Sequence, residues 1–170
     1  WLLDSTTYRW HTPEHNPSTI EGVELGRKLF YEVALSDDFS MSCASCHVQG
    51  DGFSDVRQFS IGTNGAVGRR QAMAVANLAW DALFFWDGRS TSLEDQAFRP
   101  VTDPAEMRNT WPTVVARLQA HPEYPRLFER AFGTATIDSL NVVRAIAQFE
   151  RSLISLNSRF DRFRYLGDST

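Results

Sequence analysis

The sequence predicts a mainly α-helical domain with long irregular loops, and three observations support this. Apolar residues recur at helical spacing in several separate segments. Alternating apolar and polar residues, the usual pattern of strands, are nearly absent. The length of 170 residues is enough for one domain with a hydrophobic core and too short for two domains of typical size.

The clearest predicted helix covers residues 137–155 and is capped by Asp138 or Ser139. Its apolar stripe consists of Leu140, Val143, Ile146, Ala147, Phe149, Leu153 and Ile154. Capping residues and shorter apolar patterns predict further helices over residues 19–32, 92–97, 104–108, 111–121 and 123–133.

Two segments are predicted to be irregular. Residues 1–18 contain prolines and little periodicity, so we expect an N-terminal arm there. Residues 36–71 are rich in Gly, Ser, Asp and Asn. A loop of that length is unusual in a compact domain unless it wraps around something. We therefore expect a domain over residues 19–170 that encloses a bound group.

Composition and charge restrict the classes of partner. Hydrophobic residues make up 42% and charged residues 22%, as in ordinary soluble globular proteins. The net charge of −4 argues against nucleic acid, because phosphate binding requires a basic face. No apolar run approaches the roughly 20 residues of a membrane span, and the first ten residues lack the pattern of a signal peptide.

Cys43 and Cys46 are the only cysteines, and His47 follows directly. The pattern C-x-x-C-H is a signature of c-type haem attachment. Two cysteines three apart on a helical turn face the same way and can form thioethers with the porphyrin vinyl groups, while the next histidine reaches the iron. The motif predicts a cytochrome c-like haem domain with one covalent haem c and His47 as its proximal iron ligand.

Two other interpretations of the cysteines stay open. A thioredoxin-like C-x-x-C usually lies in a βαβ unit, and strand patterns are few here. A zinc site needs four ligands, and His11 and His15 could join the cysteines. Pro13 lies between those two histidines, however, and His47 would have no role. We treat His11, His15 and His121 as surface residues.

Three segments carry a family resemblance: "NPSTIEGVELGRKLFYEVALSDDFSMSCASCH" at 16–47, "FFWDGRSTSLEDQAFRPVTDPAEM" at 84–107 and "FERSLISLNSRFDRF" at 149–163. The first two resemble the first haem domain of bacterial di-haem cytochrome c peroxidases and related MauG-type enzymes. The third resembles the helix that closes this domain. The resemblance extends over residues 16–168, nearly the whole chain.

The resemblance implies roles for five residues. His47 corresponds to the proximal ligand of the peroxide-reacting haem, and Trp86 to a tryptophan between the two haems. Gln96 and Glu106 correspond to the pair that lines the distal pocket, and Pro100 to a pocket wall. A carboxylate there can move the proton that peroxide must transfer between its oxygens, while an amide orients the molecule. Taken alone, Glu106 also fits the first turn of a helix, and Trp86 a core position.

Arginines and phenylalanines are further candidates around the haem. Propionates are costly to bury unpaired, and the arginines that could pair with them are Arg69, Arg70 and Arg89. The porphyrin could be walled by Phe53, Phe59 and Phe84. The arginines could equally well be ordinary exposed residues, and the phenylalanines ordinary core residues.

The chain departs from the family pattern at two positions. Many members carry a histidine ligand 16 residues after the proximal one, and this chain has Thr63 there. Met73 is the nearest other ligand, although methionine in an apolar segment more often fills core. We therefore expect an open or water-occupied sixth iron position. Gln71 replaces an asparagine that helps to bind calcium in the family, which weakens the case for calcium.

The expected function is that of a haem-c peroxidase-type oxidoreductase domain that reacts with hydrogen peroxide. Its electrons would come from a second haem or from a protein such as a small cytochrome or cupredoxin, unless a protein substrate is oxidised instead. The family's second haem domain is absent from this chain. Haem c attachment implies a periplasmic location, and a homodimer is left open. The alternative is a single-haem electron-transfer cytochrome c without catalysis.

Overall fold

The computed structural model describes residues 12–167, and it confirms the mainly α class. The described residues contain no sheet, only isolated β-bridges. The helices are α1 (Ile20–Phe30), α2 (Leu93–Thr102), α3 (Trp111–Ala120), α4 (Tyr124–Phe132), α5 (Ser139–Ser152) and α6 (Arg159–Asp161). The predicted arm lies outside the described residues up to position 11, and residues 12–18 contain no helix.

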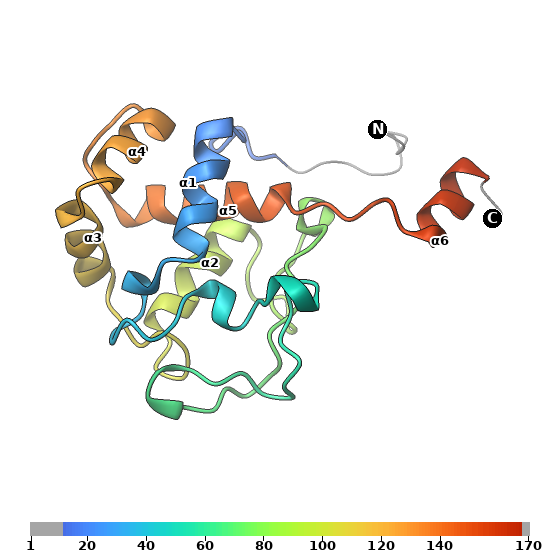
Figure 1. Cartoon of the computed structure of the whole chain (residues 1–170), viewed down its shortest axis with the longest axis horizontal. Helices are drawn as coiled ribbons and strands as arrows, with labels where there is room; N and C mark the ends of the chain where they lie inside the picture. Colours follow the sequence, from blue (N-terminus) through green and yellow to red (C-terminus); the bar gives the residue numbers. More distant parts are fainter. Residues whose placement is uncertain (1–11, 168–170) are drawn as a thin grey trace.

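Helix α5 crosses the middle of the molecule (Figure 1). Helices α1 and α2 pack against it, while α3 and α4 lie together at one end. The long segment between α1 and α2 covers one side and contains only short helical turns, as predicted from its composition. In the described residues every helix is too short or too polar to cross a lipid bilayer.

The local signals for helix ends are confirmed. Thr19 accepts a hydrogen bond from the Gly22 N–H at the start of α1, and Asp138 accepts one from the Asn141 N–H at the start of α5. Gly133 ends α4 in the left-handed conformation, with φ of 72°. These caps involve neighbouring residues only, which is why they can be predicted from sequence.

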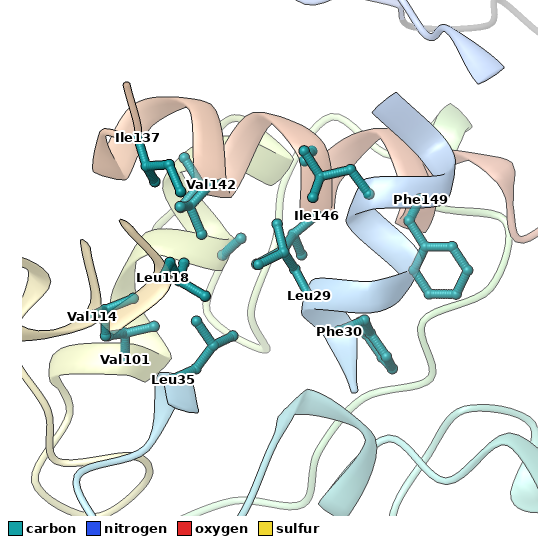
Figure 2. Packing of buried hydrophobic residues seen from close by; sticks show 14 of the residues in the cluster. Leu29, Phe30, Leu35, Val101, Val114, Leu118, Ile137, Val142, Ile146 and Phe149 are labelled. Carbon is teal, nitrogen blue, oxygen red and sulfur yellow. The ribbon is translucent and has the colours of Figure 1, made fainter. Parts of the chain in front are cut away.

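The core forms where α1, α3 and α5 meet (Figure 2). Leu29 and Phe30 of α1 pack toward Ile146 and Phe149 of α5, and all four are almost fully buried. Other members of this core are Leu35, Val101, Val114, Leu118, Ile137 and Val142. Leu140 does not belong to the core, because its side chain is 49% exposed, so its place in the predicted stripe was wrong.

Helices α1 and α5 approach closely because α1 carries glycine at the contact. A Cβ atom at Gly26 would overlap the backbone carbonyl of Ala145, and one at Gly22 would overlap the Gln148 side chain. The carbonyl cannot move away without shifting α5. The spacing of these two helices therefore depends on Gly26.

We expect Gly26→Ala to destabilise the folded chain by about 2 kcal/mol, because the added methyl group must push the helices apart. The measurement is the urea midpoint of unfolding. Gly50→Ala is the matched control, since a Cβ atom there meets nothing within 4 Å. Equal midpoints for the two variants would contradict the close helix contact.

The segment after Ser92 differs from its prediction. Helix α2 continues to Thr102 through Pro100, although proline has no N–H to donate to the preceding turn. The helix predicted over 104–108 is wrong, because these residues form a turn around Asp103. Asp103 Oδ1 accepts from the Ala105 N–H at 2.8 Å, and its carbonyl accepts from the Arg108 N–H at 3.0 Å.

The closing segment is also not a single helix. Helix α5 ends at Ser152, before the predicted end at 155, because the next residues bond to Asn77. The Asn77 N–H donates to the Leu153 carbonyl, and Asn77 Oδ1 accepts from the Ser155 N–H, both at 2.8 Å. Helix α6 and a π-helical turn, Arg162–Leu166, follow after an extended stretch (Figure 1).

Candidate haem site

Cys43, Cys46 and His47 lie on one short helical turn, Cys43–Ser45 and the residues after it. The Cys43 carbonyl accepts hydrogen bonds from the Cys46 and His47 N–H groups at 3.2 and 2.9 Å. Both thiols are free and half-buried, and both cysteines pack against the core. Burial raises the pKa of each thiol. This turn presents two unpaired cysteines to one region, as thioether attachment requires.

The His47 ring is held in one tautomer. Its Nδ1 lies 3.2 Å from the carbonyl oxygen of Phe53, which can only accept, so Nδ1 carries the proton. The Nε2 lone pair is then available to a metal. Burial lowers the pKa of His47 and outweighs the opposite effect of the Phe53 and Met73 carbonyls. A neutral imidazole with a defined tautomer fits the predicted role of an iron ligand.

The Phe30 ring lies next to His47 and joins it to a cluster of phenylalanines. The Phe30 ring lies 6.2 Å from His47, 6.1 Å from Phe53 and 5.2 Å from Phe149 between centroids. Of the three phenylalanines predicted around the porphyrin, Phe53 thus lies beside the ligand. Phe84 is buried with α2 and α5 residues as ordinary core, and Phe59 is 41% exposed.

Glu106 lies in the Asp103 turn and has a shifted pKa. Burial and the neighbouring Asp103 raise its pKa to about 7, while Arg89 acts in the opposite direction. Its charge in turn raises the pKa of both Cys43 and Cys46, so the carboxyl group lies within electrostatic reach of both attachment points. Because the segment is a turn, the alternative explanation of Glu106 as a charge at a helix start is wrong.

Thr63 lies beside Glu106. Its N–H donates to the Glu106 carbonyl at 2.8 Å, and a Cβ atom at Gly62 would overlap the Ala105 carbonyl. The Thr63 side chain is only 2% exposed, and its hydroxyl has no partner among the described residues. A buried hydroxyl, rather than an imidazole, therefore adjoins the carboxyl-bearing turn.

Trp86 lies at the surface, with 60% of the residue exposed, so the core interpretation was wrong. Its indole N–H donates to the Gln71 carbonyl at 2.9 Å. Gln96 and Pro100 lie half-buried on α2, and no hydrogen bond joins the Gln96 amide to Glu106. The structure therefore brings Thr63 next to Glu106 and leaves Trp86 accessible.

Two of the predicted arginines converge on one carboxylate. Arg70 and Arg89 each place an Nη1 atom 2.9 Å from an Asp87 oxygen, and they help to lower the pKa of Asp87. The Arg89 guanidinium also lies 3.5 Å from the Phe85 ring centroid. All three arginines are exposed, including Arg69, and only Arg89 influences the pKa of Glu106.

Sequence reasoning missed a buried charged cluster on α2 and α5. Arg151 pairs with Glu94, which also accepts from Asn16 Nδ2 at 2.6 Å. Glu150 is 5% exposed, its Oε2 has no hydrogen-bond partner within the described part of the chain, and burial raises its pKa to about 8. Its charge raises the pKa of Cys43. Glu150 and Arg151 lie in the segment "FERS", but no known sequence motif assigns a role to either residue.

The zinc interpretation receives no support from the described residues. Residues 12–167 contain no group of three or more His, Cys, Asp or Glu side chains that could hold a metal ion. His11 lies outside the described residues, and His15 is exposed. Haem iron needs fewer protein ligands, since the porphyrin supplies four, and the Cys43–His47 turn fits that requirement.

Comparison with known proteins gives the family. Residues 20–170 match the family model described as di-haem cytochrome c peroxidase. The chain belongs to this family. MauG of Methylorubrum extorquens is 43% identical over 159 residues, which cover 93% of this chain and 45% of that protein. Cytochrome c peroxidase Ccp of Escherichia coli K12 is 37% identical over 152 residues, covering 89% and 32%.

Solved structures agree with this assignment. A MauG-like protein associated with microbial copper homeostasis superposes with a TM-score of 0.91 at 33% identity, covering all of this chain and 51% of that one. The di-haem peroxidase BthA of Burkholderia thailandensis, at 23% identity and a TM-score of 0.76, shares the fold. The chain thus spans less than half the length of these two curated relatives and about half of the MauG-like structure.

Proposed function

We propose that this chain is a periplasmic haem-c domain of a peroxidase-type oxidoreductase that reacts with hydrogen peroxide. One observation carries the proposal. The Glu106 carboxyl, with a pKa of about 7, lies within electrostatic reach of the two cysteines of the attachment motif. Perturbed carboxyls close to a cofactor are typical of acid–base catalysis.

The residues fit a covalent haem. Cys43 and Cys46 are unpaired thiols that would form the two thioethers, and His47 would offer Nε2 to the iron. When bound, the haem supplies the iron and redox chemistry that break the peroxide O–O bond. The Phe30 and Phe53 rings help to exclude water from the His47 side.

Glu106 would act as the proton shuttle. Because its pKa is about 7, both protonation states are populated at neutral pH. The carboxylate can accept a proton from one peroxide oxygen and return it to the other, and Gln96 can orient the molecule through its amide. The resemblance assigns Thr63 to the position of a family histidine, and its buried hydroxyl would not compete with peroxide as that histidine would.

Electrons would enter from outside the domain. Reduction of one hydrogen peroxide to two waters consumes two electrons and two protons. The exposed Trp86 ring offers a redox-active side chain at the surface. The donor would be a second haem, a small cytochrome or cupredoxin, or a protein substrate that is oxidised in its place.

The absorption spectrum of the haem-loaded chain tests this proposal. We expect a high-spin ferric spectrum that changes on addition of cyanide or peroxide. The alternative, an electron-transfer cytochrome, requires a low-spin His/Met spectrum that is lost in Met73→Ala. The backbone carbonyl of Met73 raises the pKa of His47, and this nearness to the proposed proximal ligand supports the peroxidase over the His/Met carrier.

A further inference from the structure

We propose that Gln71 is a positioning residue that fixes the Trp86 indole relative to the haem-attachment turn. The functional part of this inference rests on the proposed function, in which Trp86 passes electrons. The geometric part depends only on contacts within this chain. The family resemblance relates Gln71 only to a calcium site, and its two contacts with other segments appear only in the structure.

Gln71 contacts one segment through its backbone carbonyl and another through its side-chain amide. Its backbone carbonyl accepts from the Trp86 indole N–H at 2.9 Å. Its side-chain Nε2 donates to the Asp55 carbonyl at 2.5 Å. The side chain thus anchors the carbonyl that holds the indole. Trp86 is 60% exposed, so packing contributes little to its orientation.

The anchor at Asp55 is rigid. The Asp55 side chain is buried, and both of its oxygens accept from the Arg57 guanidinium at 2.8 Å. These contacts lower the pKa of Asp55 to about 2, so the carboxylate stays ionised at neutral pH. Loss of the Gln71 contact would therefore free residue 71 and leave the Asp55 turn in place.

The same anchor reaches the attachment motif. Arg57 Nη2 lies 3.4 Å from the Ser45 carbonyl, between the two cysteines. Ser60 helps to lower the pKa of both Cys46 and Asp55, and its hydroxyl accepts from the Ala72 N–H at 3.3 Å. A continuous set of hydrogen bonds thus runs from the cysteine turn through Asp55 and Gln71 to Trp86. Holding a redox-active ring at a fixed separation keeps electron transfer from depending on loop motion.

The test compares Gln71→Met and Gln71→Glu, which keep the side-chain length but lack the amide donor. Gln58→Met is the matched control, because Gln58 lies exposed in the same loop region and its side chain forms no hydrogen bond with residues 12–167. Indole N–H signals of the five tryptophans are followed by NMR in the haem-loaded, diamagnetic ferrous CO form. Trp86→Phe assigns the signal of Trp86.

We expect the Trp86 indole N–H to exchange with solvent about fivefold faster in both Gln71 variants, the effect of losing one ordinary hydrogen bond. The Gln58→Met protein should match the wild type. Peroxide-driven oxidation of a reduced cytochrome should slow in the Gln71 variants, while cyanide binding stays unchanged. Wild-type exchange rates and chemical shifts in both Gln71 variants would overturn the inference. If Trp86→Phe leaves donor oxidation unchanged, the electron path through Trp86 is wrong, and indole exchange alone decides the role of Gln71.

Discussion

Replacing Glu106 with glutamine is expected to slow the reaction of the haem-loaded chain with hydrogen peroxide by ~100-fold or more. Glutamine keeps the size and polarity of the side chain but cannot accept the proton that peroxide must transfer. Haem content should not change, because Glu106 lies in the Asp103 turn and holds neither the cysteines nor His47. Stopped-flow absorbance after mixing with peroxide measures the rate.

The pH dependence of this reaction has a definite sign. The working form of Glu106 is the carboxylate, so the wild-type rate should rise as pH increases through about 7 and then level off. The Glu106→Gln rate should be flat over the same range. Glu129→Gln, an exposed change on α4, is the control and should behave as wild type. A Glu106→Gln protein with wild-type rates would remove Glu106 from the mechanism.

Replacing Glu150 with glutamine is expected to stabilise the folded chain by a few kcal/mol at pH 9 and to have little effect at pH 5. Burial and the charge of Glu94 raise the pKa of Glu150 to about 8, although Arg151 opposes them. Cys43, another group coupled to Glu150, would form a thioether under the proposed function and would then no longer titrate.

The sign follows from linkage between protonation and folding. The folded chain holds a proton on Glu150 up to about pH 8, whereas the unfolded chain releases it at the ordinary glutamate pKa of about 4.3. The free energy of unfolding therefore falls as pH rises through this window. Glutamine cannot release a proton, so the variant avoids this loss.

Urea midpoints at pH 5 and pH 9, in the same haem state, measure the effect. The exposed Glu129→Gln change again serves as control, and its midpoints should follow the wild type at both pH values. If Glu150→Gln and wild type lose equal stability between pH 5 and pH 9, Glu150 is ionised in the folded chain and its burial does not control its charge.

Much of the candidate site could be predicted because its signals are local. The C-x-x-C-H turn is a run of adjacent residues, and the structure forms it with hydrogen bonds to the Cys43 carbonyl. The family register, which assigns Thr63 to the position 16 residues after His47, stays a prediction, and the structure shows only that Thr63 lies beside Glu106. Glu106 itself depended on resemblance, since its turn was predicted as a helix.

Other parts of the site could not be predicted, because no local pattern encodes them. The contact of Gln71 with Asp55 spans 16 residues, and the pair of Glu94 with Arg151 spans 57. Each forms only after separate segments pack. The exposure of Trp86 could not be predicted for the same reason, since a tryptophan in an apolar run, taken alone, more often belongs to the core.

The sequence by itself determined the helical class, the helix caps and the covalent attachment motif, because these depend on residues within one or two turns of each other. Only the tertiary structure decided how far α2 and α5 extend, that Glu106 sits in a turn beside Thr63, and that Glu150 is buried near Cys43. Burial and electrostatic fields arise when distant segments meet. The chemistry of the two carboxyls is therefore a property of the packed fold.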